Sequence, residues 1–367
     1  MDKFKFLLVG SGNIASTYIK AAANVDEIEI TGIVSRSGNR PSGASEALPV
    51  FSSISEADCD FDAVILATPN GCHASGCLEA AARGKHVFTE KTLALTRKDM
   101  DQMINVCKEK NLQLGVAFQR RTAPDNIIVR DMLKAGKFGK IVACELATNF
   151  WRPQSYYSNS PYRGNFALDG GGPFVQQASH NLDLYVWFFG LPQKVYAFTG
   201  TFLHEMESED YGSAICRHEN GMIGTIIAST ASKPGFEAVM TIRTEKGCIT
   251  LEGDRITQWQ IEDIPNPSRS AGLELHSGAS TNAVTATTGH ETLLRDFAQK
   301  CRNGGKLIVS GEDARAASEL ILLIYESAFF SEEKKFSPPK LYSGRGRCCN
   351  CLRGLIAPLK ISTAADS

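Results

Sequence analysis

The sequence lacks a long hydrophobic segment, an excess of charge of either sign and, before residue 330, closely spaced cysteines. Its most apolar late run, residues 320–325, is far shorter than the roughly 20 residues that cross a bilayer. The amino terminus shows no apolar region followed by a small-residue cleavage site. We therefore expect a cytoplasmic protein that does not associate with membranes.

Charge and cysteine spacing also exclude some partners. Lys and Arg total 39 against 40 for Asp and Glu, and no basic block precedes residue 330. Nucleic acid is therefore not expected as a partner, whereas small polar metabolites remain possible. Of the 11 cysteines, those in the body of the chain lie singly, unlike those of a zinc site or a small disulfide scaffold. We expect them to be reduced, and we expect no metal site.

A chain of 367 residues is longer than a single core usually grows, so we expect two domains. The first, residues 1–120, alternates short apolar runs with longer amphipathic ones. This alternation predicts an α/β domain with a doubly wound parallel sheet. Its expected strands are Phe4–Val9, Ile28–Val34, Ala63–Ala67, His86–Thr89 and Gln113–Ala117.

The second expected domain, residues 121–336, contains successive strand-like segments joined by short turns. This order predicts an α+β domain with a large, mainly antiparallel open sheet. Its expected helices are Phe174–Phe189, Glu291–Arg302 and Glu312–Phe330, of which the later two could pack back on the first domain. Residues 337–367, with Cys348-Cys349-Asn350-Cys351, are expected to form a disordered tail. The cysteines could be acylated or bind a metal, but a fourth ligand is lacking, so we favour neither role.

A glycine-rich motif follows the first expected strand. Gly10, Gly12 and Ala15, with Asn13 and Ile14 between them, fit GxGxxA at a junction of strand and helix. Gly10 would allow the tight turn, Gly12 the close approach of a pyrophosphate, and Ala15 the packing of helix on strand. The position of the motif favours a dinucleotide site over a structural glycine turn, with the phosphates above the start of the helix.

The end of the second expected strand bears on the choice of cofactor. An acidic residue there would bind the ribose of NAD, but the sequence has Ser35 and Arg36, with Arg40 nearby. A guanidinium and hydroxyls suit a ribose phosphate, so we favour NADP over NAD. Alternatively, Arg36 stacks on the adenine in an enzyme that uses either cofactor.

Two more segments follow expected strands, at the edge of the sheet where ligands bind in doubly wound folds. In the first, Thr68, Pro69 and Asn70 precede His73, although an ordinary Pro-Asn turn that caps the next helix is as compatible with these residues. In the second, Glu90 and Lys91 end the run His86–Thr89. An amine at this place could exchange a proton with a substrate hydroxyl while nicotinamide exchanges hydride.

A third cluster joins a glycine turn to an expected helix. Asp169 precedes three glycines, and Gln176, Gln177 and His180 follow. Gln176 and His180 are four residues apart, so both could face one pocket from a single helical face. A histidine buried and satisfied in the core is the alternative, which the neighbouring glycines and polar residues make less favourable.

Together these segments resemble the Gfo/Idh/MocA oxidoreductases, named for glucose-fructose oxidoreductase and inositol dehydrogenase. The resemblance spans residues 1 to about 335. It rests on the glycine loop, Thr68-Pro69-Asn70 with His73, Glu90-Lys91, residues 117–121, Trp151-Arg152-Pro153-Gln154 with Tyr156-Tyr157, Tyr162-Arg163-Gly164, the triple glycine with His180 and Asp183, and Gly289-His290-Glu291.

The resemblance implies a Rossmann domain, a second domain whose open sheet often serves oligomerisation, and redox chemistry on sugars, cyclitols or related polyols. It implies that Lys91 is catalytic, with His180 beside it. The chain departs from the family pattern at Thr92, usually proline, and at Gln176, often aspartate. Because a neutral Gln176 cannot raise the basicity of His180, proton transfer should depend more on Lys91.

The expected substrate contacts are polar and aromatic, as a polyol requires. They are Gln119, Arg152, Tyr156, Tyr157, Arg163, Gln176 and Gln177. Two arginines could also hold a carboxylate or phosphate, although solvated loop charges are the alternative. We thus expect an NAD(P)-dependent oxidoreductase that acts on a sugar or polyol and forms a homo-oligomer, a dimer or tetramer. The other hypothesis is a non-catalytic sensor of the same fold.

Overall fold

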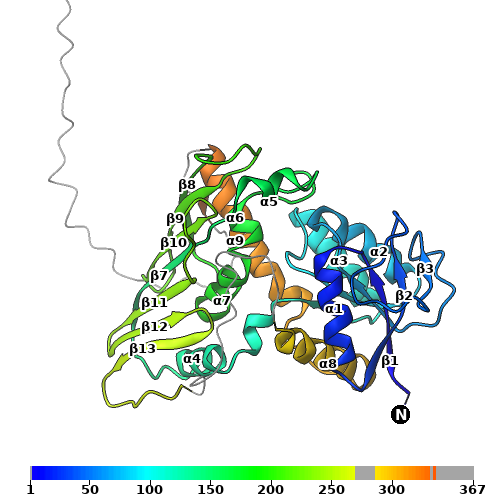
Figure 1. The fold of residues 1–367 in the computed structure, drawn as a ribbon. Coiled ribbons are helices and arrows are strands. Elements are labelled where there is room, and N and C mark those ends of the chain that lie inside the picture. The colour runs from blue at the N-terminus through cyan, green and yellow to red at the C-terminus, as the bar shows by residue number, and fades with distance from the viewer. Residues whose placement is uncertain (1, 269–285, 331–333, 336–367) are drawn as a thin grey trace, which may run out of the picture. The chain divides into compact units, whose positions relative to one another are not determined.

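The first sheet consists of six parallel strands in the order β3-β2-β1-β4-β5-β6. In the computed structural model, which describes residues 2–268, 286–330 and 334–335, these strands lie among the first 116 residues (Figure 1). The predicted doubly wound sheet is therefore confirmed. The strands are β1 Phe4–Val9, β2 Ile28–Val34, β3 Val50–Phe51, β4 Ala63–Leu66, β5 His86–Thr89 and β6 Leu114–Val116. The short β3 was not predicted, because two residues make no recognisable pattern.

Helices cover this sheet, and its central strands are mostly buried. Phe6, Leu7 and Leu8 of β1 are all fully buried, so no alternation of exposed and buried residues appears. The helices between the strands are α1 Asn13–Ala23, α2 His73–Ala82 and α3 Arg97–Glu109. In α3 the Thr96 side chain caps the first turn by accepting from the Asp99 amide, as a helix N-cap does.

Two helices from the end of the described chain also contact the first sheet and its helices. They are α8 Thr288–Asn303 and α9 Gly311–Phe330. Phe297 of α8 packs edge-on against Phe88 at 5.3 Å between ring centroids, and Figure 1 shows α8 beside α1. Arg97 of α3 pairs with Glu319 and Glu326 of α9. These contacts join residues that are far apart in the sequence, so local sequence patterns do not predict where α8 and α9 pack.

The second sheet has eight strands in the order β13-β12-β11-β7-β10-β9-β8-β14. Every neighbouring pair is antiparallel except β7 with β10, so the predicted mainly antiparallel sheet is confirmed. The strands are β7 Ile141–Asn149, β8 Lys194–Gly200, β9 Tyr211–Arg217, β10 Ile223–Ser229, β11 Val239–Thr244, β12 Gly247–Glu252, β13 Arg255–Ile261 and β14 Lys334–Lys335.

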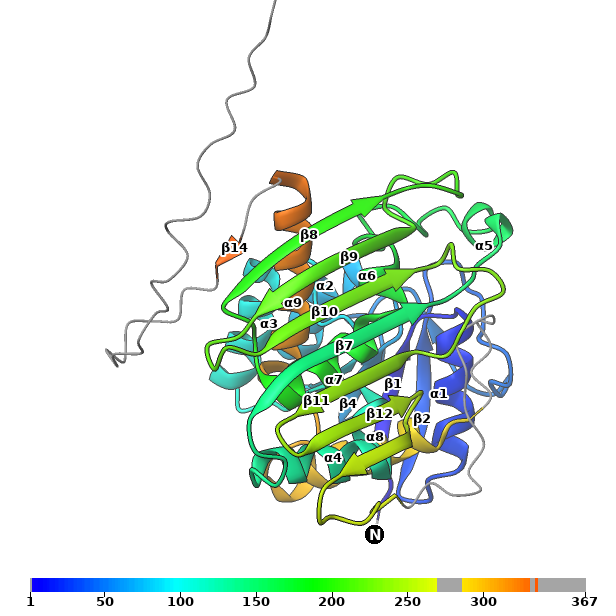
Figure 2. The same cartoon turned by 90° about the vertical axis from the view of Figure 1, so that its left-hand side faces the viewer.

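One face of the second sheet is covered by helices and the other is open. The helices on this part of the chain are α4 Pro124–Lys134, α5 Gln154–Ser158, α6 Pro173–Gln176 and α7 Ser179–Phe189. In β9, Gly212, Ala214 and Cys216 are buried while Tyr211 and Ile215 are exposed, the period of two expected for a half-covered sheet. Figure 2 shows the strands with α6, α7 and α9 behind them.

The expected helix Phe174–Phe189 is wrong in one respect, because it is divided into α6 and α7. The amides of Gln177 and Ala178 both donate to the Pro173 carbonyl, at 3.1 and 2.8 Å. The second of these bonds spans five residues rather than four and ends α6. Gln176 and His180 therefore belong to different helices.

The Cys348-Cys349-Asn350-Cys351 cluster and the rest of residues 337–367 lie outside the described residues. None of the helices in the described ranges is both long and apolar enough to span a bilayer.

Candidate active site

The glycine turn between β1 and α1 has the geometry of a phosphate-binding loop. Gly10 has φ +124°, and a Cβ there would lie 2.3 Å from the Ala67 carbonyl oxygen, so only glycine fits. Gly12 precedes α1, and a Cβ on it would meet no atom within 4 Å, which leaves open space above the helix. Asn13, Ile14 and the fully buried Ala15 form the first turn, whose free amides point towards this space. These residues fit a dinucleotide pyrophosphate.

The end of β2 lies beside the glycine turn. The Gly10 amide donates to the Val34 carbonyl at 2.9 Å, and the Ser35 hydroxyl is 3.2 Å from that of Ser11. Arg36 is exposed. Arg40, which the sequence placed near the ribose, instead donates to the carbonyls of its own loop at residues 45 and 48. Arg36 is thus better placed than Arg40 to contact a ribose phosphate.

The segment after β4 contributes to the site through Asn70, whereas His73 is structural. Pro69 precedes the 3₁₀ turn Asn70–Cys72, and Asn70 Nδ2 donates to the Asp169 carbonyl at 2.9 Å. His73, expected among the cofactor contacts, is fully buried, and its ring nitrogens lie 2.8 Å from the Thr92 carbonyl and 3.1 Å from that of Thr68. It therefore ties these two loops together, and both its nitrogens are occupied by the protein.

Lys91 lies two residues after the end of β5, and a main-chain carbonyl of α6 holds its amine. Lys91 Nζ donates to the Gln176 carbonyl at 2.8 Å. Carbonyls in the last turn of a helix lack helical partners, so the break after α6 makes this acceptor available. Burial lowers the pKa of Lys91, Glu90 and Asp169 partly oppose that effect, and Arg152 adds to it. An amine with a lowered pKa in a fixed place suits proton transfer.

Glu90 and Thr92 flank the lysine and are both buried. Glu90 accepts hydrogen bonds from the Tyr18 hydroxyl at 2.6 Å and from the Lys91 amide at 3.2 Å. The Lys91–Thr92 peptide bond is cis. Glu90 thus anchors the end of β5 to α1 and places a negative charge next to Lys91.

His180 lies in the first turn of α7, with its ring edge-on to Phe118 at 5.8 Å between centroids. Burial lowers the pKa of His180 well below its ordinary value, and the charges of Lys91, Arg120 and His290 lower it further. The imidazole is therefore neutral at neutral pH. Its buried Nδ1 has no hydrogen-bond partner among the described residues, so it can bond a ligand hydroxyl.

Gln176 and Asp169 form a polar pair beside Lys91. Gln176 Nε2 donates to Asp169 Oδ1 at 2.6 Å and to the Asp169 carbonyl at 2.9 Å, and the Gly164 amide donates to Oδ2 at 2.9 Å. Burial raises the pKa of Asp169 to about 6, against the lowering effects of the Gly164 amide and of the charges of Lys91 and Arg163. The sequence offered one signal for this acid, its place directly before three glycines.

Two arginines share one tyrosine ring. The guanidinium carbons of Arg163 and Arg152 lie 4.2 and 5.6 Å from the centroid of Tyr156. Burial lowers the pKa of Arg152, and the charge of Arg163 contributes to the lowering. Gln177 Nε2 reaches the Tyr156 hydroxyl at 3.4 Å. This cluster concentrates positive charge near Lys91 and is suited to an anionic group.

Tyr157, expected to contact substrate, is instead buried beneath Tyr156. Its hydroxyl lies 2.7 Å from the Thr230 hydroxyl, and its ring packs edge-on against Tyr156 at 5.0 Å. Of the two tyrosines expected to contact substrate, Tyr156 is therefore the one that remains in the candidate site. Gln119 lies in the 3₁₀ turn Gln119–Thr122. Its buried Oε1 has no hydrogen-bond partner within the part of the chain that the structure describes, so this oxygen can accept a hydrogen bond from a ligand.

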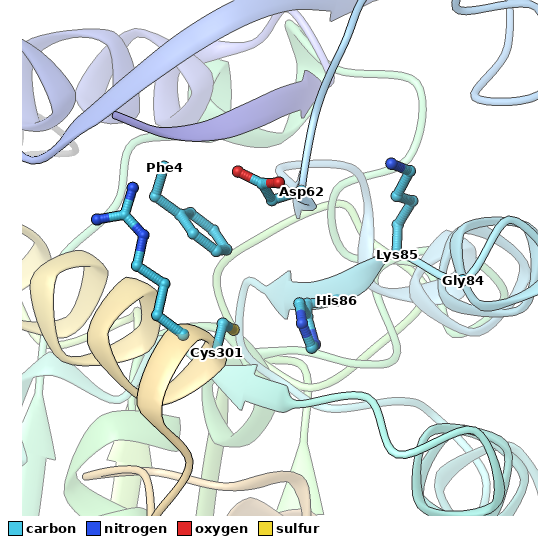
Figure 3. Close-up of a pocket in the computed structure, with 7 residues that line it drawn as sticks. Phe4, Asp62, Gly84, Lys85, His86 and Cys301 are labelled. Carbon is cyan, nitrogen blue, oxygen red and sulfur yellow. The ribbon is translucent and has the colours of Figure 1, made fainter. Parts of the chain in front are cut away.

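A cavity of about 280 Å³ lies away from these residues, at the opposite ends of the strands (Figure 3). Its lining side chains already have partners in the protein: Asp62 accepts from the Lys5 amide, His86 from the Gln113 amide, Lys85 donates to the Phe61 carbonyl and Arg302 to that of Asp2. We assign no function to it.

Comparison with known proteins identifies related oxidoreductases. Residues 4–118 match the model of an oxidoreductase family with an NAD-binding Rossmann fold, and residues 127–250 match the GFO/IDH/MocA C-terminal domain. The inositol 2-dehydrogenase of Rhizobium meliloti (strain 1021) is 23% identical over 86% of this chain and 94% of its own length. The scyllo-inositol 2-dehydrogenase (NADP(+)) IolU of Bacillus subtilis (strain 168) is 24% identical over 63% and 77%.

Among solved structures, the WlbA dehydrogenase from Bordetella pertussis in complex with NADH and UDP-GlcNAcA is similar over most of the chain. It is 30% identical, with a TM-score of 0.80, and the match covers 92% of this chain and 99% of that one. The similarity therefore includes both sheets.

Proposed function

The chain belongs to the Gfo/Idh/MocA family of NAD-binding oxidoreductases, and we propose that it moves hydride between a nicotinamide dinucleotide and a secondary alcohol or ketone of a sugar, sugar derivative or cyclitol. The observation that carries the proposal is the Lys91 amine, held 2.8 Å from the Gln176 carbonyl at the same edge of the sheet as the glycine turn. Residues 1–120 would bind the cofactor and residues 121–336 most of the substrate. The bound nicotinamide would supply the hydride acceptor or donor.

Lys91 would handle the proton. In the oxidation of an alcohol, its neutral amine takes the hydroxyl proton, and in reduction its ammonium returns the proton to the developing alkoxide. Burial lowers the pKa of Lys91, which increases the neutral fraction near neutral pH. The neutral His180, with its unpaired Nδ1, would hold the same hydroxyl in place.

The arginine cluster favours a substrate with negative charge. Arg152 and Arg163 lie against the same ring of Tyr156, where a bound carboxylate or phosphate would reduce their mutual repulsion and accept their hydrogen bonds. The Bordetella relative holds UDP-GlcNAcA, whose UDP part is anionic. Uronic acids and nucleotide sugars are therefore the first substrates to test, and neutral polyols the second.

NADP is favoured over NAD, because Ser35 and the exposed Arg36 occupy the place where an acid would bind a free ribose. Relatives of both kinds exist: IolU is named for NADP(+), and the Bordetella structure holds NADH. Arg36→Ala should weaken NADP binding about tenfold or more by titration and leave NAD binding nearly unchanged. An equal effect on both cofactors would indicate stacking on adenine instead.

The open face of the second sheet would bind another copy of the chain. Three neighbouring strands, β8, β9 and β10, expose large apolar side chains there: Tyr196, Phe198, Ile215 and Ile223. A group of this kind is typical of an interaction surface, whereas single exposed apolar residues are common on any protein. A homo-oligomer, a dimer or tetramer, would cover them.

The decisive experiment measures turnover at the absorbance band of reduced nicotinamide. Nucleotide sugars, uronic acids, sugars, inositols and dihydrodiols are tested with both cofactors, with Lys91→Ala beside the wild type. That variant should lose about 10²- to 10⁴-fold in kcat and still bind cofactor. Lys98→Ala, an exposed lysine of α3, is the matched control. Normal turnover by Lys91→Ala would refute the assigned role, and tight cofactor binding without any turnover by the wild type would favour the sensor.

A further inference from the structure

Asp169 is a buried acid to which the proposed mechanism gives no task. It is 5% exposed and comes from the loop before α6 rather than from a helix. Its Oδ1 accepts from Gln176 Nε2, its Oδ2 from the Gly164 amide, and its carbonyl from both Asn70 and Gln176. One residue thus connects the turn after β4, the loop at Gly164 and the end of α6.

The Lys91 amine depends on the same segment. Lys91 Nζ donates to the carbonyl of Gln176, and the side chain of Gln176 is fixed by both the carboxylate and the carbonyl of Asp169. A shift of Asp169 would therefore move the acceptor that aims the amine. The negative charge of Asp169 also acts on Lys91 directly and opposes the effect of burial on its pKa.

We propose that Asp169 is a positioning residue for proton transfer: it fixes Gln176, whose carbonyl orients the Lys91 amine, and it supplies a negative charge that keeps the amine able to accept a proton. This role rests on the proposed function of Lys91. Without Asp169, the buried amine would lose both its fixed acceptor and a counter-charge, and it would become a weaker base.

Other charged and titratable groups act on the pair and are compatible with this role. Burial raises the pKa of Asp169 to about 6, and the charges of Lys91 and Arg163 oppose this rise. The charge of Asp169 also raises the pKa values of Tyr156 and Tyr325. Asp169 is therefore ionised at neutral pH and becomes protonated as the pH falls through about 6. Lys91 itself is acted on by Glu90, Asp169 and Arg152.

The test measures the pKa of the Lys91 amine without any substrate. The full chain is acetylated competitively with acetic anhydride across a pH series, and the labelling of the peptide that contains Lys91 is followed by mass spectrometry. In Asp169→Asn the apparent pKa of Lys91 should fall by about half a unit or more. Glu209→Gln is the matched control. Glu209 is a second buried acid, and it accepts a hydrogen bond from the Gly172 amide in the triple-glycine segment after Asp169, but it is not among the charges that act on Lys91.

The positioning role and its alternatives predict different results. An unchanged Lys91 pKa in Asp169→Asn, or an equal shift in Glu209→Gln, would overturn the positioning role. If Asp169→Asn does not fold, the wild type is titrated instead, and the [ε-¹³C]lysine NMR signal of Lys91 is assigned by its loss in Lys91→Arg. The chemical shift of this signal should inflect near pH 6, where Asp169 titrates. A titration without that inflection would equally overturn the positioning role. Where wild-type turnover is established, the limb of the kcat/KM profile that Lys91 sets, acidic in oxidation and basic in reduction, should shift with the labelling pKa. Failure of turnover with a shifted Lys91 pKa would refute the function alone.

Discussion

The ion pair between Arg121 and Asp183 should be the most sensitive electrostatic contact behind the candidate site. Arg121 Nε and Nη2 donate to the two carboxylate oxygens at 2.8 and 2.6 Å. The side chains are 3% and 0% exposed, and Asp183 lies on α7, the helix that carries His180. Even with this partner, burial raises the pKa of Asp183 to about 6.

Replacing Arg121 by Met would leave the carboxylate buried without its counter-charge, which typically costs about 3–5 kcal/mol in the free energy of unfolding at pH 8. The folded-state pKa of Asp183, already above its unfolded value, would rise further. The folded state would then bind a proton more readily than the unfolded state. The loss is therefore largest above the folded pKa and becomes smaller as the pH falls through it.

Urea denaturation at about pH 8 and pH 5.5 measures both effects. Arg130→Met is the matched control: the Arg130 guanidinium also lies over Trp187, at 4.9 Å against 5.4 Å for Arg121, but its pair with Asp131 is exposed. It should cost less than about 1 kcal/mol. A loss below about 1 kcal/mol in Arg121→Met, or one that is as large at pH 5.5 as at pH 8, would refute the reasoning.

Three further outcomes are expected. Gly10→Ala should unfold or strongly destabilise the protein, because its Cβ would lie 2.3 Å from a main-chain oxygen. Gly12→Ala should keep the wild-type melting temperature and weaken cofactor binding in titrations. Equal melting temperatures of the two variants would contradict this. Tyr157→Phe should cost about 1 kcal/mol of stability through its lost hydroxyl bond and leave KM unchanged, while Tyr156→Phe should raise KM. A raised KM in Tyr157→Phe would instead restore Tyr157 as a substrate contact. Ile215→Asp, on the open sheet face, should reduce the mass found by light scattering, and an unchanged mass would place the interface elsewhere.

The sequence determined the features that depend on local spacing. The alternation of apolar runs and amphipathic segments predicted the parallel sheet, because strands covered on both faces need continuous apolar residues. The fit of Gly10, Gly12 and Ala15 to one motif also follows from neighbouring residues, and the structure places the two glycines between β1 and α1 and Ala15 in the first turn of α1. The switch to successive strands joined by short turns after residue 140 predicted the antiparallel sheet, because parallel neighbours would need long crossover connections.

Tertiary structure decided which side chains meet. Lys91 and Gln176 are 85 residues apart, and their contact requires the break between α6 and α7, which the apolar pattern of the segment does not reveal. Tyr156 and Tyr157 are equivalent in the sequence, yet the Tyr157 hydroxyl bonds the Thr230 hydroxyl, whereas the Tyr156 hydroxyl accepts from Gln177. Asp169 is an ordinary loop acid until Gln176 and the Gly164 amide surround it. Burial and hydrogen bonding give these groups their chemistry, and both arise only when distant segments pack together.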